Sequence, residues 1–236
     1  MFPLRDNIRT RRRPVMTWTI IAVTSAVYVI EVLVHPEHLQ QIAHLFGIVP
    51  ARYTHPAWAS RVGFPADDYW PFLTTIFLHA GFVHLASNMW FLWIFGDNVE
   101  DRMGRARFLG FYLVCGIIAG VVHTWTNSYS VVPAVGASGA IAGVLGAYIV
   151  LYPRARVETV VWLVFWPVFF DLAAVFYVGL WFAIQLLNGT AALLGPEQMG
   201  GVAWWAHVGG FVTGVSLLPF FTQNVASRHR TSNEAA

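Results

Sequence analysis

A serine that could act as a nucleophile stands at the edge of an apolar segment. Ser138 lies in the sequence Gly136-Ala137-Ser138-Gly139, between an uncharged loop and the apolar run 140–152. A serine at a helix N-terminus lies beside free backbone N–H groups and the positive end of the helix dipole. A nucleophile with an anion-stabilising pocket needs both features. The same sequence also suits a small-residue patch for helix packing in membranes, so its partner residues decide between the two.

A histidine in a later apolar segment is the candidate general base. His207 lies in the Ala-His-Val-Gly-Gly sequence of residues 206–210. Both segments carry glycines at intervals of three or four residues: Gly139, Gly143, Gly146, Gly210 and Gly214. Small residues let two helices approach closely, so the imidazole could take the serine proton and return it to a leaving amine. No carboxylate is placed to complete a triad, and the sequence therefore predicts a Ser-His dyad.

Two further polar residues could stabilise a developing oxyanion. His84 and Asn88 are spaced i, i+4 and share one face of a helix. Asn88 would donate its side-chain N–H, together with His84 and the backbone N–H groups of Ser138 and Gly139. Losing one such donor typically lowers the rate by about 100- to 1000-fold. The alternative for each polar residue is a buried group that a neighbouring helix carbonyl satisfies.

A metal site is a second alternative for the histidines. His79, His84 and His207 could bind zinc, since imidazole is a common zinc ligand. This set lacks a carboxylate or cysteine as the fourth ligand and leaves the serine unexplained. We therefore predict no metal at these histidines.

Composition indicates an integral membrane protein with one domain. Of 236 residues, 57% are hydrophobic and 11% charged, and the mean hydropathy is +0.57. All 14 basic residues are arginine and they form no basic face, so nucleic-acid binding has no support. The single cysteine, Cys115, lies in an apolar run and reads as a buried, inert thiol.

Hydropathy predicts an all-α protein with six membrane spans. The segments are 15–34, 71–96, 108–125, 138–152, the part of 157–187 after Asp171, and 202–221. Between them we expect a long interfacial connection at 35–69, a charged turn at 97–107, an interfacial or buried approach before Asp171, and a loop at 188–201.

The fourth segment is too short to cross a bilayer. Its fifteen residues would extend about 22 Å as a helix, against a hydrocarbon core of about 30 Å. One end must therefore stop inside the membrane, where exposed backbone is tolerated only beside water or protein. This predicts a submerged, water-filled pocket around Ser138.

Arginine placement predicts the orientation of the spans. Apart from Arg52 and Arg61 in the long first loop, every arginine lies in a tail or in the loops after the second and fourth segments. This alternation predicts two cytoplasmic tails, 1–14 and 223–236, that flank a membrane domain at 15–222. Ser138 and His207 then lie near the outer ends of their spans.

Four separate motifs resemble the rhomboid intramembrane serine proteases. They are the serine motif 136–139, the histidine motif 206–210, the sequence His-Ala-Gly-Phe-Val-His-Leu-Ala-Ser-Asn at 79–88, and an E-x-x-x-G element at 100–104. The resemblance covers roughly residues 71–219, and the motifs occur in the family's order. This ordered set of motifs identifies a family far more specifically than a single G-x-S-x-G match would.

The resemblance implies a six-helix bundle whose short fourth helix lifts the serine to an outward-facing cavity. It implies that Ser138 is the nucleophile and His207 the base, with His84 and Asn88 in the oxyanion hole. The residues to which it gives structural roles are His79 at the mouth of the site, Glu100, Arg102 and Gly104 in the turn, and Gly136, Gly143, Gly210 and Gly214 in helix packing. It also implies transmembrane protein substrates in the lipid bilayer, no cofactor, a first loop partly within the membrane, and the fifth span as a lateral gate.

Two positions depart from the family pattern. Some relatives carry an aromatic residue four positions after the serine that stacks on the histidine, where this chain has Ala142. A different neighbour, such as an aromatic residue of the second or fifth span, would then hold His207. The Trp-Arg pair often found in the first loop is also absent, since Arg52 and Trp58 are not adjacent.

The sequence thus predicts a membrane serine endopeptidase whose active site faces outward, most simply in a bacterial inner membrane. One alternative is an inactive rhomboid-like protein that binds or escorts membrane proteins, but such a protein would be expected to lack part of the dyad. Another is a small transporter or channel, which would need paired intramembrane charges or repeated halves. The substrate and the oligomeric state are not indicated.

Overall fold

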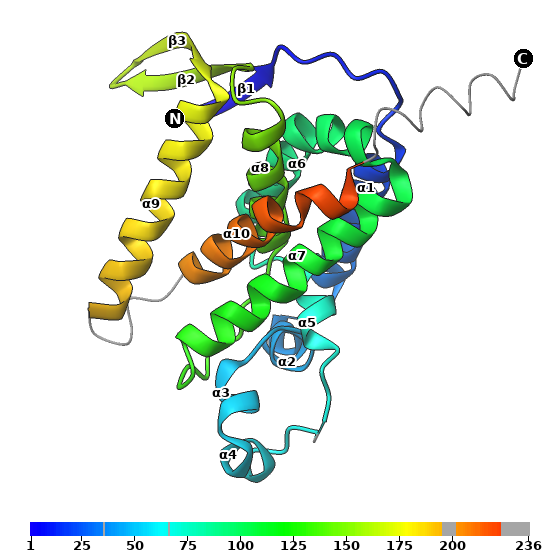
Figure 1. The fold of residues 1–236 in the computed structure, drawn as a ribbon. Helices are drawn as coiled ribbons and strands as arrows, with labels where there is room; N and C mark the ends of the chain where they lie inside the picture. Colours follow the sequence, from blue (N-terminus) through cyan, green and yellow to red (C-terminus); the bar gives the residue numbers. More distant parts are fainter. Residues whose placement is uncertain (35, 66, 195–201, 223–236) are drawn as a thin grey trace, which may run out of the picture.

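The computed structural model describes residues 1–34, 36–65, 67–194 and 202–222, and this part of the chain is mostly helical, as predicted (Figure 1). Its long helices are α1 (Val15–Leu33), α6 (Phe82–Met103), α7 (Arg105–Thr126), α8 (Ser138–Leu151), α9 (Ala174–Leu194) and α10 (Trp204–Phe221). Shorter elements lie between α1 and α6: α2 (Pro36–Phe46), α3 (Pro50–Thr54), α4 (Pro56–Arg61), α5 (Pro71–Thr74) and the 3₁₀ helix η1 (Thr75–Phe77).

Within the described residues, α1, α7 and α9 are long and apolar enough to cross a membrane, and α8 is a shorter apolar helix. Each of the six predicted segments overlaps one of the six long helices. The number of spans and the side on which the termini lie stay predictions.

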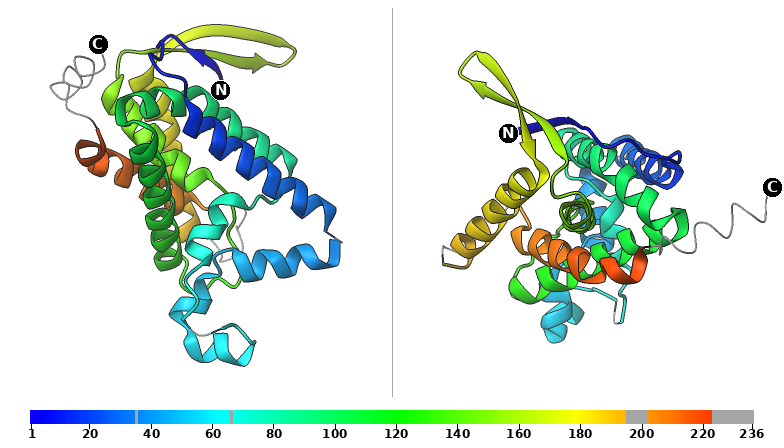
Figure 2. Two further views of the ribbon diagram at one scale, coloured as in Figure 1. Left: turned by 90° about the vertical axis from the view of Figure 1, so that its right-hand side faces the viewer. Right: turned by 45° about the horizontal axis from the view of Figure 1, so that its top comes forward.

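Helix α8 forms the centre of the bundle. It packs against α6, α7, α9 and α10, and the right view of Figure 2 shows it end-on among them. Its residues from Gly139 to Tyr148 are all buried. Close contact with α10 requires glycine, because a Cβ on Gly210 would stand 2.0 Å from the carbonyl oxygen of Gly139. A Cβ on Gly214 would meet the carbonyl oxygen of Gly143 at the same distance. These contacts hold the middle of α10 against the first half of α8.

The all-α prediction is wrong for one part of the chain, which forms a three-stranded antiparallel sheet. Strand β1 (Phe2–Asp6) pairs with β2 (Arg156–Leu163), and β2 pairs with β3 (Trp166–Ala173). The segment before Asp171, expected as an approach to a span, is thus a hairpin. Its β-branched and aromatic residues favour extended backbone over helix. The predicted tail 1–14 likewise contributes a strand.

The predicted second span and the turn after it also need correction. Helix α6 begins only at Phe82, because α5 and η1 end before an extended segment at 78–81. The predicted charged turn at 97–107 is helical except at Gly104, whose φ of +84° favours glycine. Charged side chains do not end a helix when they can reach water or a partner, so the single glycine separates α6 from α7.

The predicted loop 188–201 is partly helix, since α9 continues to Leu194. The rest of that loop, 195–201, and the predicted C-terminal tail 223–236 lie outside the described residues.

Candidate active site

Ser138 is the first residue of α8, and the start of this helix leaves backbone donors free. Ala137 precedes it and provides no side-chain cap, and the first helical bond runs from Ile141 N to Ala137 O. The N–H groups before Ile141, including those of Ser138 and Gly139, are not used by the helix. Ser138 itself is only partly buried. A reactive group could therefore reach both its hydroxyl and the adjacent N–H groups.

The histidine of α10 contacts the serine directly. His207 Nε2 lies 2.7 Å from Ser138 Oγ, and the imidazole is buried, with 8% of the residue exposed. The glycine contacts between α8 and α10 bring these two side chains, far apart in the sequence, to hydrogen-bond distance. Sequence reasoning placed the two residues on neighbouring helices, and the structure brings them together.

The other imidazole nitrogen has a partner that sequence reasoning missed. His207 Nδ1 lies 2.8 Å from Oε1 of Gln185, a buried residue of α9. Gln185 Nε2 donates to the carbonyl of Trp181 at 3.1 Å, which leaves the amide oxygen facing the imidazole. An amide oxygen only accepts hydrogen bonds, so Nδ1 carries the proton and Nε2 is left to accept the serine hydroxyl. A glutamine in an apolar helix was the available signal, since intramembrane polar residues are functional candidates.

Two tryptophans take the place of the aromatic residue missing at Ala142. The Trp181 ring on α9 lies tilted against His207, with ring centroids 5.8 Å apart. Trp204, in the first turn of α10, meets the imidazole edge-on at 6.3 Å. We predicted an aromatic neighbour of His207 from the second or fifth segment, and Trp181 on α9, the helix of the fifth segment, is that neighbour.

The candidate oxyanion residues lie on α6. The His84 ring packs against Gly136, where an added Cβ would stand 2.7 Å from His84 Cε1 and 3.8 Å from Ser138 Oγ. Gly136 also has a φ of +137°, a backbone conformation that favours glycine. Asn88, one helical turn beyond His84, is buried, and its Nδ2 has no hydrogen-bond partner among the described residues. Seven buried side-chain atoms of the described residues have no hydrogen-bond partner, and Asn88 Nδ2 is the one that the predicted oxyanion hole would use as a donor.

His79 lies next to these residues, in the segment that precedes α6. Its ring centroid is 5.0 Å from that of His84, and its backbone N–H donates to Glu31 Oε2 at 3.3 Å. Within the described residues no group of three or more His, Cys, Asp or Glu side chains is placed to hold a metal ion.

A small cavity adjoins the serine. It has a volume of about 40 Å³, enough for one water molecule, and its lining includes Thr75, His123, Gly136 and Ser138. The submerged, water-filled pocket that the sequence predicts around Ser138 stays a prediction, since most of the residues that line this cavity are apolar.

The E-x-x-x-G element at 100–104 lies at the end of α6, and its glutamate binds a different part of the chain than predicted. Glu100 is buried and accepts hydrogen bonds from Met16 N at 3.0 Å and from Thr17 N and Oγ1 at 2.7 and 2.8 Å. It thus binds the free N–H groups at the start of α1 rather than the turn in which it was placed. Gly104 forms the junction between α6 and α7, and Arg102 at the end of α6 is half-buried.

Comparison with known proteins gives the same family as the motifs. The Rhomboid domain matches residues 66–224. The rhomboid protease GluP of Bacillus subtilis is 44% identical over 89 residues, 37% of this chain and 17% of GluP. YdcA, a second rhomboid of Bacillus subtilis, is 37% identical over 116 residues, 47% of this chain and 57% of YdcA.

A mitochondrial relative is similar over a longer stretch. The presenilin-associated rhomboid-like protein of Mus musculus is 30% identical over 155 residues, 61% of this chain and 36% of the relative. The chain thus spans less than two thirds of the length of each of these relatives. The match to the Rhomboid domain covers more than half of the chain and includes Ser138 and His207, and the chain belongs to the rhomboid family.

Proposed function

We propose that this protein is an intramembrane serine endopeptidase that cleaves membrane-anchored proteins in or beside a transmembrane helix. The observation that carries the proposal is the 2.7 Å contact between Ser138 Oγ and His207 Nε2, with Gln185 on the other imidazole nitrogen. Ser138 as nucleophile, His207 as base and Gln185 as the group that orients the base thus form a chain of two hydrogen bonds. The family membership and the relative named as a rhomboid protease support the same activity.

In the acylation step, Ser138 Oγ attacks the carbonyl carbon of the scissile peptide bond while His207 Nε2 takes the hydroxyl proton. The carbonyl oxygen becomes an oxyanion, which the N–H groups of Ser138 and Gly139 and the side chains of Asn88 and His84 would stabilise. When the tetrahedral intermediate collapses, the C–N bond breaks and the imidazolium gives its proton to the leaving amine. The product is an ester between Ser138 and the N-terminal part of the substrate.

Deacylation needs a water molecule within reach of both the ester carbonyl and His207 Nε2. Neutral His207 would remove a proton from this water while the resulting hydroxide attacks the ester carbonyl. The C–O bond to the serine then breaks, and the imidazolium returns its proton to Ser138 Oγ. Each step needs Nε2 of His207 without a hydrogen at its start, and Gln185 favours this tautomer by accepting from Nδ1.

The same proposal includes the topology and location expected from the sequence. The long helices would cross the membrane six times, with residues 15–222 as the membrane domain, both termini in the cytoplasm and Ser138 near the outer face. The arginine distribution supports this orientation. A bacterial inner membrane is the simplest location, and α9 would be the lateral gate through which a transmembrane substrate enters.

The test is covalent labelling of the detergent-purified chain with a fluorophosphonate. We expect a single adduct on Ser138 that is lost in Ser138→Ala and in His207→Ala. Matched controls are Ser87→Ala and His44→Ala, which remove an exposed serine of α6 and a histidine of α2 whose hydrogen bonds stay within their own helices. Both controls should label like the parent.

A folded parent that fails to label, beside an active relative that labels under the same conditions, would overturn the proposal. The chain would then be assigned to the second function, an inactive rhomboid-like protein that binds or escorts membrane proteins. The folding of the parent and of each variant is checked by thermal unfolding. A cooperative unfolding transition shows that a loss of labelling does not come from misfolding.

A further inference from the structure

The tip of the β2–β3 hairpin is a contiguous exposed apolar surface that the proposed activity does not use. We name residues 162–166, Trp-Leu-Val-Phe-Trp, the hairpin tip; each is between 59 and 84% exposed. Pro167, Val168 and Phe169 extend this exposed surface along β3. Apolar patches of this kind on a protein mark a surface that contacts another protein or a membrane.

The fold places the hairpin tip at one end of the helical bundle. β2 starts at Arg156, shortly after α8 ends at Leu151, and β3 runs directly into α9 at Ala174. In Figures 1 and 2 the hairpin leaves the bundle sideways, across the direction of the helices rather than along it. Because α9 is a candidate span, the hairpin lies at the level where α9 would enter the membrane. The hairpin tip would therefore lie at the level of the membrane surface.

The same end of the molecule is rich in arginine. Glu100 holds the start of α1 against α6, and Asp6 holds β1 there through Tyr148 and Asn98. The arginines brought to this end are Arg5, Arg9, Arg11, Arg12, Arg13, Arg102, Arg105, Arg107, Arg154 and Arg156. They outnumber the carboxylates there, which are Asp6, Asp97, Glu100, Asp101, Glu158 and Asp171. The end is therefore suited to an anionic surface.

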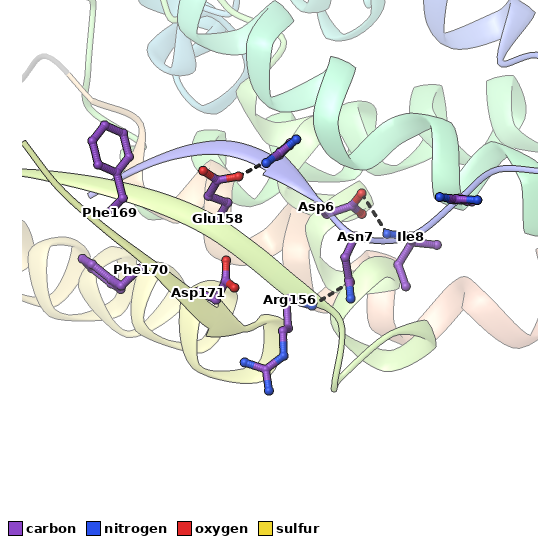
Figure 3. A pocket seen from close by; sticks show the side chains of 10 residues that line it. Asp6, Asn7, Ile8, Arg156, Glu158, Phe169, Phe170 and Asp171 are labelled. Atoms are coloured by element: carbon purple, nitrogen blue, oxygen red, sulfur yellow. Dashed lines mark hydrogen bonds and ion pairs between the residues drawn. The ribbon is translucent and has the colours of Figure 1, made fainter.

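A groove of about 710 Å³ lies at the base of the hairpin, and residues of β1, β2 and β3 line it. Its lining holds the aromatic rings of Phe169 and Phe170, three arginines and three carboxylates, and Figure 3 labels most of these side chains. Arg5 is paired with Glu158. The side chains of Arg9 and Arg156, in contrast, have no hydrogen-bond or ion-pair partner among the described residues. Two exposed cations without a partner and two aromatic rings thus line the same groove.

We propose that the hairpin is an interfacial anchor for a membrane containing anionic phospholipid. The hairpin tip inserts into the boundary between headgroups and acyl chains, where tryptophan and phenylalanine are favoured. Arg9 and Arg156 bind lipid phosphates at the mouth of the groove, each increasing the preference for anionic lipid by about fivefold. The proposal does not depend on proteolytic activity.

The test uses an environment-sensitive fluorophore on Phe165→Cys of the full chain, with one chain per lipid nanodisc. Cys115 is fully buried and should not label, which the parent chain verifies. Spin-labelled lipids that carry the quencher near the headgroup end of the acyl chain should quench about twofold more than lipids labelled near the methyl end, because interfacial segments lie only about 5–10 Å deep. Labelled phosphatidylglycerol should quench more than labelled phosphatidylcholine at equal fraction.

Variants and an aqueous quencher distinguish lipid contact at the hairpin tip from exposure to water or coverage by protein. Arg9→Gln with Arg156→Gln should remove the preference for phosphatidylglycerol and keep the depth of the probe. Arg61→Gln is the matched control, an exposed arginine of α4 outside this end of the molecule, and it should change neither. A probe that stays accessible to aqueous iodide and is not quenched by lipid overturns the proposal. A probe shielded from both iodide and lipid also overturns it, since protein then covers the tip.

Discussion

The hydrogen bond from His207 to Gln185 leads to a specific prediction for Gln185→Leu. Both residues are buried, with 8% and 5% of their surfaces exposed, so water cannot replace the lost acceptor. An unpartnered Nδ1–H in this position costs about 1–3 kcal/mol. The imidazole escapes that cost by moving the proton to Nε2 or by rotating, and either change removes the acceptor for the Ser138 hydroxyl.

The expected result is a fall of about 10- to 100-fold in the second-order rate constant for fluorophosphonate labelling of Ser138. Leucine has nearly the volume of glutamine, so α9 should keep its packing and the unfolding transition should change little. Thr190→Val is the matched control on the same helix, since among the described residues its hydroxyl donates to the carbonyl of Leu186 alone. Labelling at the parental rate in folded Gln185→Leu would refute the role of Gln185.

Gln185→Glu distinguishes orientation of the imidazole from simple packing. Glutamate keeps an acceptor oxygen in the same place, so it should restore more of the labelling rate than leucine does. An ionised carboxylate also stabilises the imidazolium, so the acid limb of the labelling profile should move to higher pH. If Gln185 has a purely structural role, Gln185→Glu should label no faster than Gln185→Leu.

Three further predictions follow from contacts elsewhere in the structure. Gly210→Ala should abolish labelling and lower the melting temperature, because its Cβ would meet the Gly139 carbonyl oxygen at 2.0 Å. Gly179→Ala on α9 is the control and should be neutral or stabilising, because its Cβ would meet no atom of the described residues within 4 Å. Asn88→Leu should lower kcat for a cleaved substrate by about 100- to 1000-fold without lowering the melting temperature, since Asn88 Nδ2 has no partner in the described structure to lose. Burial raises the pKa of Asp6 above its ordinary 3.8, so its stabilisation of docked β1 is complete below that pH and is lost as the pH rises through the raised pKa. Protection factors of the β1 amides in hydrogen exchange should therefore fall as the pH rises above 3.8, and constant protection would contradict this assignment.

Local sequence features were sufficient to predict the six long helices, apart from some of their ends, and the pairing of Ser138 with His207. Long apolar runs determine where helices form in a membrane protein, because every backbone group must be satisfied within the segment. Glycines on two such runs then indicated which helices touch, and the structure shows Gly210 and Gly214 against the carbonyl oxygens of α8. The strands were missed because the apolar composition of residues 157–170 suits a buried helix as well as a hairpin.

The partners of individual side chains could not be predicted, because they depend on how the helices are placed in space. Glu100 lies three residues from Met103 at the end of α6, yet its carboxylate binds the start of α1, 83 residues away along the chain. Gln185 shows no periodic pattern that points to His207, and its role follows only once α9 is seen beside α10. Sequence spacing identifies which residues share a helix face, but not which face of another helix they meet.

The position of α9 therefore connects two parts of the molecule that look independent in the sequence. α9 carries Gln185 and Trp181, which hold the imidazole of His207 on two sides. The same helix continues from β3 without a loop, so the hairpin at its start determines where α9 begins. If α9 moves to admit a transmembrane substrate, the hydrogen bond to His207 Nδ1 must break or the imidazole must follow. Under the proposed function, efficient proton transfer then requires α9 to return to its place after the substrate enters, and an anchored hairpin would favour that return.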